Sequence, residues 1–316
     1  MSVKVYIDGQ EGTTGLKILE RFEGRNDIEI LKIDEDKRKD NNERRKFICS
    51  SDYTFLCLPD AAAREAVALA EGSNVRIIDA STAHRTNPDW AYGFPELSKQ
   101  HREKIASSSR VAVPGCYASG FISLVYPLVS CGILPSDYPV TAHAVSGYSG
   151  AGKKAIAVYE GDEKPDEYNS PRQYALSQEH KHLPEMMKIC GLDYKPVFNP
   201  LICDYFSGMV VTVPIITRLL PKKTGLQDIY NAMCAHYEGQ KLVKVMPVMG
   251  EGVLADGFLA GNTLSGRNDM EIFVCGNDDR VVLCSRLDNL GKGASGAAIQ
   301  NMNLVLGVDE TAGLCV

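Results

Sequence analysis

The sequence predicts an α/β protein whose first part holds a parallel sheet and whose second part holds a mixed or antiparallel one. The chain opens with a strand pattern, Val3–Ile7, which runs into a glycine-rich turn and a helix. Strand and helix signals alternate up to about residue 116, which is typical of a parallel sheet with helical crossovers. Beyond that point the strand-like segments are longer and few helices separate them, which favours antiparallel pairing.

Composition narrows the class of protein. The 316 residues are enough for two domains with separate cores. A net charge of −6 and the lack of a basic tail argue against a general nucleic-acid binder. We find no signal-peptide pattern and no apolar run of the roughly 18 residues that a membrane span needs. We therefore expect a cytoplasmic protein without a membrane partner.

The ten cysteines are scattered and include no C-x-x-C pair. Without an export signal, this pattern indicates reduced thiols rather than disulfides. No four cysteine or histidine positions have the spacing of zinc ligands, so we expect no metal site.

Each element of the first part has its own signal. Leu16, Leu19 and Phe22 share one face of the first predicted helix, which ends at Gly24. Asp60 is the expected N-cap of the next helix. The remaining elements predicted here are strands Ile28–Ile33, Tyr53–Leu58, Val75–Asp79 and Arg110–Val113 and helix Ala61–Glu71.

In the second part, Thr224 is the expected cap of a helix that runs through Tyr237, and Glu160–Pro184 is expected to be a long irregular loop. Gly293–Leu306 is helical in pattern, and we expect it to pack against the first domain. The predicted division is therefore residues 1–116 plus 286–316 against 117–285. The strands predicted here are Pro139–Ser146, Val197–Ile202, Met209–Ile216, Lys241–Val248, Glu271–Cys275 and Val281–Leu287.

The turn Gly9-x-x-Gly12-x-x-Gly15 follows a strand and opens a helix, as in a Rossmann-type dinucleotide-binding domain. Glycines there permit a tight turn and let a pyrophosphate approach the helix N-terminus. Thr13 and Thr14 add hydroxyl donors. The spacing departs by one residue from G-x-G-x-x-G, so a plain strand-to-helix turn is the alternative.

The residues that follow the next strand, Ile28–Ile33, can be interpreted in two ways, and each interpretation predicts a different cofactor. Asp34 lies about 20 residues beyond the turn, where an acidic residue holds the ribose hydroxyls of NAD. Lys37, Arg38 and Lys39 follow, and cations there bind the 2′-phosphate of NADP. A solvated charge run is a third reading, and the residues alone leave the choice open.

Cys116 follows a short strand and Pro114-Gly115, at the point where a helix begins. A helix N-terminus stabilises a thiolate, and its free N–H groups can hold an oxyanion. A thiol at this place in a nucleotide-binding fold favours chemistry through a thioester. A buried cysteine in a small-residue turn is the alternative.

His180 and His182 are two residues apart, so in an extended segment they share one face. A cysteine nucleophile needs a base to take its proton and an acid to protonate the leaving oxygen. We predict that this pair serves Cys116, and the sequence does not say which ring transfers the proton.

Three further loops contain residues suited to ligands. Ser146, Gly147, Tyr148 and Ser149 end a strand and are expected to contact substrate. Asn289 and Gly293, before the last helix, are expected to face the nicotinamide. At the end of strand Val75–Asp79 come two more candidates, Ser81 for the cofactor and Arg85 for the substrate.

Taken together these motifs resemble one family, N-acetyl-γ-glutamyl-phosphate reductase in its short type 2 form. The likeness runs nearly end to end, and the Pro-Gly-Cys-Tyr-Ala block is specific in combination with Asn-Leu-x-Lys-Gly-Ala-x-Gly. The segments that carry it are Asp8–Gly15, Ala80–Thr86, Tyr92–Leu97, Pro114–Ser119, Ser146–Lys153, His180–Glu185 and Asn289–Asn303.

The resemblance implies NADPH-dependent reduction of an acyl phosphate, N-acetyl-L-glutamyl 5-phosphate, to the semialdehyde in arginine biosynthesis. It implies the architecture of semialdehyde and glyceraldehyde-3-phosphate dehydrogenases, a homodimer or homotetramer, and a thioester on Cys116. It also favours Lys37 and Arg38 over Asp34 as the cofactor contacts. The alternatives are a related reductase of aspartyl or amino-adipyl phosphates and a non-catalytic NADP-binding regulator.

Overall fold

The computed structural model describes residues 2–316, which form two compact units. Of the described residues, the first unit comprises 2–114 and 294–314, and the second comprises 115–293 and 315–316. The predicted division placed residues 115–116, 286–293 and 315–316 in the first domain. In the structure they belong to the second unit, because Cys116 opens a helix of that unit and the strand Arg280–Leu287 is paired along its whole length there.

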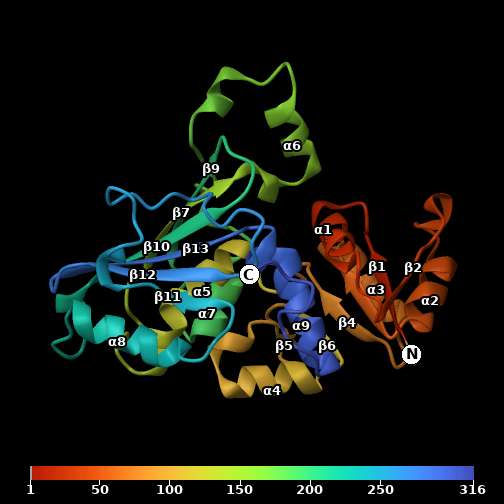
Figure 1. Ribbon diagram of the computed structural model, residues 1–316, viewed down its shortest axis with the longest axis horizontal. Coiled ribbons are helices and arrows are strands. Elements are labelled where there is room, and N and C mark those ends of the chain that lie inside the picture. The colour runs from red at the N-terminus through yellow and green to blue at the C-terminus, as the bar shows by residue number, and fades with distance from the viewer. Residues whose placement is uncertain (1) are drawn as a thin grey trace. The chain divides into compact units, whose positions relative to one another are not determined.

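Sheet A of the first unit is parallel throughout, with strand order β2-β1-β3-β4-β6-β5 (Figure 1). Its central strands are buried on both faces, as expected for a sheet between two layers of helices. The strands are β1 (Val3–Asp8), β2 (Ile28–Leu31), β3 (Tyr53–Leu56), β4 (Arg76–Asp79), β5 (Ala91–Tyr92) and β6 (Arg110–Ala112).

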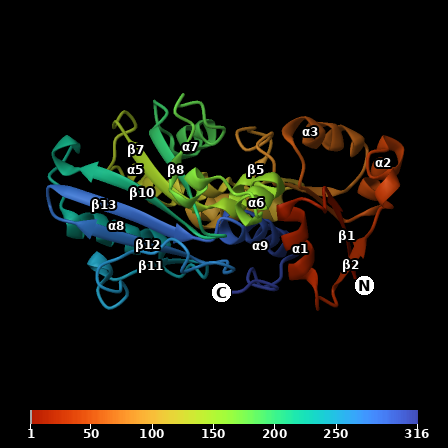
Figure 2. The ribbon, with the colours of Figure 1, turned by 90° about the horizontal axis from the view of Figure 1, so that it is seen from above.

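Alternate residues of β1 enter two different cores. Val5 and Ile7 pack with α1 (Thr13–Phe22), α4 (Lys99–Ser107) and α9 (Gly296–Leu306). Tyr6 packs with α2 (Asn41–Ser50) and α3 (Asp60–Leu69), which lie together on the other face (Figure 2). The late helix α9 therefore belongs to the first unit.

Several local expectations for helices need correction. Ile18, rather than Leu16, faces the core from α1, and Leu16 is exposed. The charged segments that form α2 and α4 were not predicted, because each buries only one or two side chains. Tertiary packing outweighs a weak apolar pattern in these helices.

Two predicted N-caps are also wrong. Pro59 occupies the cap of α3, and the Asp60 carboxylate accepts hydrogen bonds from Thr82 instead. Gly225 occupies the cap of α8 (Leu226–Tyr237), where Asp228 accepts from its amide, and Thr224 donates to a backbone carbonyl. In both cases the side chain bonds to a group in a loop instead of to an amide at the start of the helix.

Sheet B of the second unit is mixed, with order β11-β12-β13-β10-β7-β9-β8. The pairs β7–β9 and β11–β12 are parallel and the other pairs are antiparallel. The mixed sheet predicted from the sequence is confirmed. The strands are β7 (Thr141–Gly147), β8 (Arg172–Gln173), β9 (Val197–Cys203), β10 (Met209–Ile216), β11 (Val243–Val245), β12 (Met270–Gly276) and β13 (Arg280–Leu287).

Helices α5 (Cys116–Ser130), α7 (Leu183–Cys190) and α8 gather on one side of sheet B (Figure 1). Helix α6 (Lys153–Glu160) and the segment after it form an arm that extends away from the sheet. The predicted irregular segment Glu160–Pro184 falls mainly in this arm and contains only η4 and β8 before α7. The short turns are η1 (Glu35–Lys37), η2 (Pro95–Leu97), η3 (Tyr148–Ala151), η4 (Asp166–Asn169), η5 (Thr217–Leu219), η6 (Val248–Gly250) and η7 (Gly291–Ser295).

Candidate active site

The turn between β1 and α1 needs glycine at two positions. Gly9 has a φ of +88°, and a Cβ on it would lie 2.3 Å from the carbonyl oxygen of Cys57. A Cβ on Gly15 would lie 2.6 Å from the carbonyl oxygen of Gly9. Gly12 is the N-cap of α1 and makes no side-chain cap, so the N-terminal amides stay available for a phosphate. Thr13 and Thr14 are the first two residues of the helix.

Beside this turn, at the carboxyl edge of sheet A, lies a cavity of about 250 Å³. Apolar side chains such as Ile33 and Leu58 line its floor, and Glu11, Arg38 and Lys39 line its charged side. The mixture fits an adenosine whose ribose is recognised by charge. The residues present therefore fit the adenine half of a dinucleotide.

The structure separates the two readings of the segment after β2. The Asp34 side chain is 71% exposed, pairs with Lys37 at 3.0 Å and does not line the cavity. Arg38 does line it. Asp34 is therefore poorly placed to hold a ribose, and the arrangement favours a 2′-phosphate beside Arg38.

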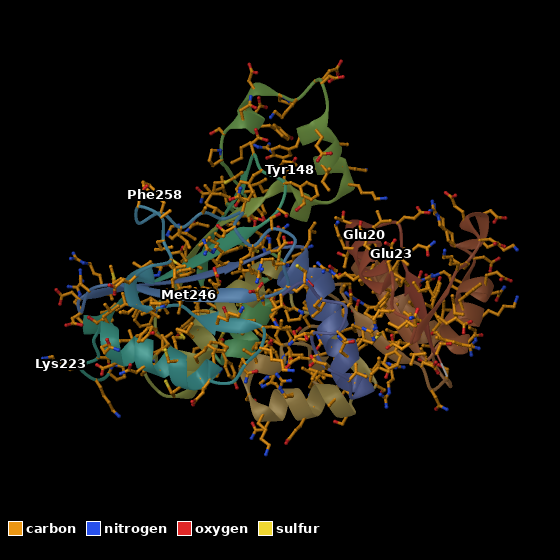
Figure 3. The ribbon with its side chains drawn as sticks, in the orientation of Figure 1. Glu20, Glu23, Tyr148, Lys223, Met246 and Phe258 are labelled. Atoms are coloured by element: carbon orange, nitrogen blue, oxygen red, sulfur yellow. The ribbon has the colours of Figure 1, made fainter. Side chains whose placement is uncertain are left out.

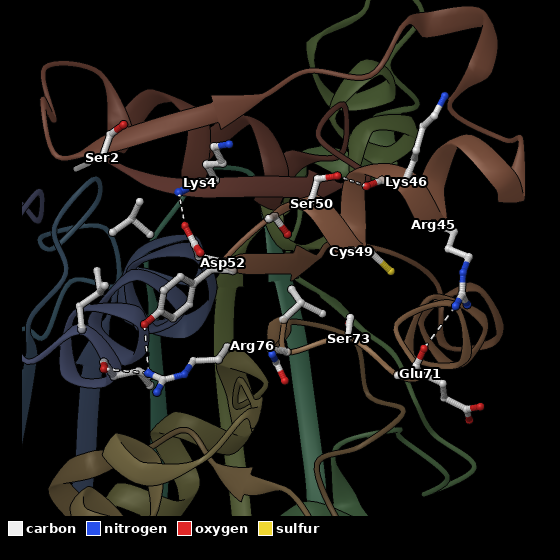
Figure 4. A pocket seen from close by; sticks show the side chains of 18 of the residues that line it. Ser2, Lys4, Arg45, Lys46, Cys49, Ser50, Asp52, Glu71, Ser73 and Arg76 are labelled. Carbon is white, nitrogen blue, oxygen red and sulfur yellow. Dashed lines mark hydrogen bonds between the residues drawn. The ribbon is translucent and has the colours of Figure 1, made fainter.

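A larger hollow, of about 1350 Å³, lies at the opposite, amino-terminal edge of sheet A (Figure 4). Its arginines donate hydrogen bonds to carbonyl groups at or just after the ends of helices. Arg45 donates to the carbonyls of Leu69 and Glu71, and Arg76 donates to the carbonyl of Val305. Ligands of such sheets bind at the carboxyl edge. We therefore assign this hollow no part in the chemistry.

The loop after β4 braces the carboxyl edge. The Asp79 carboxylate accepts hydrogen bonds from both the amide and the hydroxyl of Ser81, and it contacts Nδ1 of His84 at 2.6 Å. Arg85, 8% exposed, donates to the carbonyls of Val113 and Ala80. These bonds tie β4 to the end of β6. A role for Ser81 toward cofactor and for Arg85 toward substrate stays a prediction.

Cys116 is the first residue of α5, directly after the N-cap Gly115. It is partly exposed, whereas most of α5 beyond it is buried. The Gly115 amide donates to the buried Glu185 carboxylate at 3.3 Å. Glu185 lies in the first turn of α7, so this bond joins the starts of two helices. Sequence reasoning included Glu185 only in the segment His180–Glu185 that carries the resemblance and gave it no role of its own.

The predicted histidine pair lies against the residue that follows Cys116. The rings of His180 and His182 are 5.8 and 6.0 Å from the ring of Tyr117, and 4.7 Å from each other, measured between centroids. Nδ1 of His180 accepts the backbone N–H of His182 at 3.1 Å. His182 is buried and is the N-cap residue of α7.

Two tyrosines complete this cluster: Tyr117, which sequence reasoning quoted only as part of the Pro-Gly-Cys-Tyr-Ala block, and Tyr174, which it did not single out. The rings of Tyr117 and Tyr174 have centroids 6.4 Å apart, and burial raises the pKa of Tyr117 well above its ordinary value. Burial raises the pKa of Tyr174 to about 12, and the charge of a Cys116 thiolate acts in the same direction. Both phenols therefore stay protonated at neutral pH and remain donors. No local signal marks Tyr174, because only the fold brings it to α5.

The loop at the end of β7 is held by Asn289. The Asn289 oxygen accepts from the amide of Gly208 at 2.8 Å, and its nitrogen donates to the hydroxyl of Ser149 at 3.0 Å. Asn289 was predicted to bind the nicotinamide, but it is 2% exposed and engaged within the second unit. We therefore assign it to positioning Ser149.

Tyr148 lies between Ser146 and Ser149 in the sequence, and its ring packs against the arm. Tyr148 stacks on Tyr159 of α6, with centroids 4.4 Å apart, and lies at the base of the arm (Figure 3). Its hydroxyl donates to Glu160 at the end of the same helix. Gly147 accommodates the close approach of the Phe206 backbone, whose carbonyl oxygen would lie 2.6 Å from a Cβ there.

Gly293 packs directly against the candidate nucleophile. A Cβ on Gly293 would lie 2.7 Å from the Cβ and 3.2 Å from the Cα of Cys116. We predicted Gly293 as a cofactor contact. The structure gives a second reason for glycine there, since any side chain would displace Cys116.

Gly293→Ala should therefore slow alkylation of Cys116 by iodoacetamide, because the thiol moves away from the helix N-terminus. We expect a decrease of about tenfold or more, since shifts near 1 Å cost that much at reactive groups. The rate is measured by mass spectrometry of the Cys116 peptide. Cys49, exposed in the first unit, is the internal control and should react at an unchanged rate. Unchanged labelling of Cys116 would contradict the packing argument.

Two classes of site are not seen. Within residues 2–316, no group of three or more His, Cys, Asp or Glu side chains is arranged to hold a metal ion. Over the same residues, no helix has the length and apolarity to cross a membrane.

Two family models cover most of the chain. Residues 4–107 match the NAD binding domain of semialdehyde dehydrogenase, and residues 116–289 match its dimerisation domain. The first match confirms the prediction of a nicotinamide dinucleotide cofactor. NADPH is the usual form of that cofactor in reductases of the family that the sequence resembles.

Solved structures show the same fold. Aspartate semialdehyde dehydrogenase II of Vibrio cholerae superposes with a TM-score of 0.72 at 14% identity, covering 97% of this chain and 99% of that one. The enzyme of Francisella tularensis gives 0.70 at 16% identity, covering 96% and 100%. The predicted fold class is confirmed.

Curated relatives are much more similar in sequence. N-acetyl-gamma-glutamyl-phosphate reductase 2 of Nostoc sp. is 46% identical over 98% of this chain and 99% of its own. The reductase of Sinorhizobium medicae is 47% identical over 97% and 99%, and that of Brucella ovis is 46% identical over 97% and 100%. With the predicted fold and a thiol at the start of α5, these likenesses confirm the resemblance seen in the sequence: the chain belongs to the N-acetyl-γ-glutamyl-phosphate reductase family.

Proposed function

We propose that this protein reduces N-acetyl-L-glutamyl 5-phosphate to N-acetyl-L-glutamate 5-semialdehyde with NADPH, releasing phosphate, as a step of arginine biosynthesis. The observation that carries the proposal is the position of Cys116 as the first residue of α5, with the histidine pair packed against Tyr117. The names of the relatives supply the substrate.

Cys116 is the proposed nucleophile. Its thiolate attacks the acyl carbon, a C–S bond forms, the C–O bond to phosphate breaks, and phosphate leaves with the bonding pair. The free N–H groups at the start of α5 are suited to hold the oxyanion of the tetrahedral intermediate. The protonated phenols of Tyr117 and Tyr174 add neutral donors to the same cluster.

The two histidines have different proposed roles. Because Nδ1 of His180 accepts a backbone N–H, neutral His180 carries its proton on Nε2 and is suited to donate toward substrate oxygens. His182 is then the proposed general base. It takes the proton of the Cys116 thiol and later returns it to an oxygen of the substrate. Its burial at the start of α7 restricts the orientation of the ring.

When bound, NADPH supplies the hydride that reduces the thioester carbon. The first unit holds it through the amides and glycines of the Gly9–Gly15 turn, the hydroxyls of Thr13 and Thr14, and Arg38 at the 2′-phosphate. Collapse of the thiohemiacetal on Cys116 breaks the C–S bond, releases the aldehyde and restores the thiolate. Ser146, Gly147, Ser149 and Arg85 remain the proposed substrate contacts.

Cys116→Ser should abolish turnover and leave NADPH binding unchanged, because an alkoxide forms far less readily than a thiolate. The assay is phosphate-dependent reduction of NADP⁺ with N-acetylglutamate semialdehyde, and aspartate semialdehyde is the comparison substrate. A serine variant within about tenfold of wild type would exclude the covalent route, since loss of a nucleophile costs far more. Preference for aspartate semialdehyde would instead reassign the substrate.

His182→Asn should lower kcat by about 10² to 10⁴ and move the acidic side of its pH profile to higher pH, because the thiol loses its base and must ionise unaided. His180→Asn, the matched control two residues away, should raise KM more than it lowers kcat and keep the shape of the profile. Rates are measured across pH 5–9 in the same reverse assay. The opposite pattern for the two variants would exchange the roles.

We further propose that a second copy covers the outer face of sheet B. Apolar and small residues lie half exposed on this face, including Val145, Leu201, Pro214 and Val282, and the dimerisation model covers these strands. His143, an exposed residue of β7 on this face, lies opposite Asn199 of β9 and Thr212 of β10. A homodimer or homotetramer in the reducing cytoplasm fits this surface and the ten free cysteines.

His143→Glu should therefore shift the protein toward monomer, because a buried unpaired charge at an interface is costly. Size-exclusion chromatography with light scattering measures the mass. Lys223→Glu, an exposed charge change in the loop before α8, is the control and should keep the oligomer (Figure 3). An oligomer that persists in the His143 variant would place the interface elsewhere.

A further inference from the structure

Glu11 lies within the phosphate-binding turn, between Gly9 and Gly12, and lines the charged side of the nucleotide cavity. Its side chain is 47% exposed. A carboxylate at this place is unexpected in a cavity that receives a phosphorylated ribose, because like charges repel. The contacts of Glu11 explain what it does there.

The Glu11 carboxylate forms an ion pair with the Arg38 guanidinium. Arg38 follows β2 and η1, so the pair joins two segments of the lining that are separate in sequence. A second carboxylate, Glu35, lies 3.8 Å from the same guanidinium nitrogen. Arg38 therefore faces two anions of its own chain.

The other two cations of this segment, Lys37 and Lys39, are less suited than Arg38 to bind a 2′-phosphate. Lys37 is paired with Asp34 outside the cavity, whereas Lys39 lines it. Arg38 is the cation whose planar guanidinium suits a phosphate. A 2′-phosphate that binds Arg38 must compete with the Glu11 carboxylate for it.

We propose that Glu11 is a stand-in for the 2′-phosphate: it holds Arg38 across the cavity mouth in the cofactor-free protein and is displaced when NADP(H) binds. The inference rests on the proposed use of NADPH. Glu11 thereby lowers the affinity for the 2′-phosphate and sets how strongly the protein discriminates NADP(H) from NAD(H). An exposed ion pair is weak enough to exchange readily for a phosphate contact.

The test uses the intact protein and two probes without nicotinamide, 2′,5′-ADP and 5′-AMP, with dissociation constants from calorimetry. Glu11→Gln keeps the size of the side chain and removes its charge. It should tighten 2′,5′-ADP by about 2- to 5-fold, the range of an exposed pair. It should change 5′-AMP by less than about 1.5-fold, since that ligand does not need Arg38.

Two further variants complete a double-mutant cycle. Arg38→Gln should weaken 2′,5′-ADP by about tenfold or more. In the Arg38→Gln background, Glu11→Gln should change 2′,5′-ADP by less than about 1.5-fold, because no guanidinium is left to compete for. Glu23→Gln, the same charge change in the exposed residue after α1, is the matched control and should leave both probes unchanged (Figure 3).

The outcomes separate this inference from the proposed function. If wild type binds 2′,5′-ADP no more tightly than 5′-AMP, the assignment of Arg38 to a 2′-phosphate fails. If wild type discriminates but Glu11→Gln leaves 2′,5′-ADP unchanged or weakens it, only the stand-in role fails. An equal gain with and without Arg38 also overturns it, since that result means simple repulsion. None of these readouts depends on Cys116.

Discussion

The hydrogen bond from the Gly115 amide to the Glu185 carboxylate joins the two segments on which the candidate chemistry depends. One segment starts α5 with Cys116, and the other starts α7 with His182. Because the bond is buried, losing either partner leaves an unsatisfied polar group. The contact therefore holds the starts of the two helices together, while Tyr117 packs against His182 and Gly293 packs against Cys116.

Small residues serve close packing at several points around the second unit's site. Gly293 leaves room for Cys116, and Gly147 leaves room for the Phe206 backbone. Asn289 uses both ends of its amide to hold the loop that contains Ser149. The glycine-rich sequence before α9 therefore places the nucleophile, in addition to any contact with a cofactor.

In the first unit, the charged side chains near the carboxyl edge of sheet A are already bonded to other groups of the same chain. Asp79 holds Ser81 and His84, Arg85 ties β4 to β6, and Arg38 is paired with Glu11. A cofactor enters a site whose polar groups already have partners. Affinity is then the difference between new and existing contacts, which is small and readily tuned.

The sequence by itself determined the fold class, the Gly9–Gly15 turn and the family, because strand–turn–helix order and glycine spacing are local properties that the residues there impose. It predicted Cys116 at a helix start for the same reason. Only the tertiary structure decided that Asp34 faces solvent while Arg38 lines the cavity, and that Tyr174 and Glu185 join the cluster. It also decided that α2 and α4 form and that Asp60 and Thr224 cap nothing. Those outcomes depend on partners distant in sequence, which no local pattern specifies.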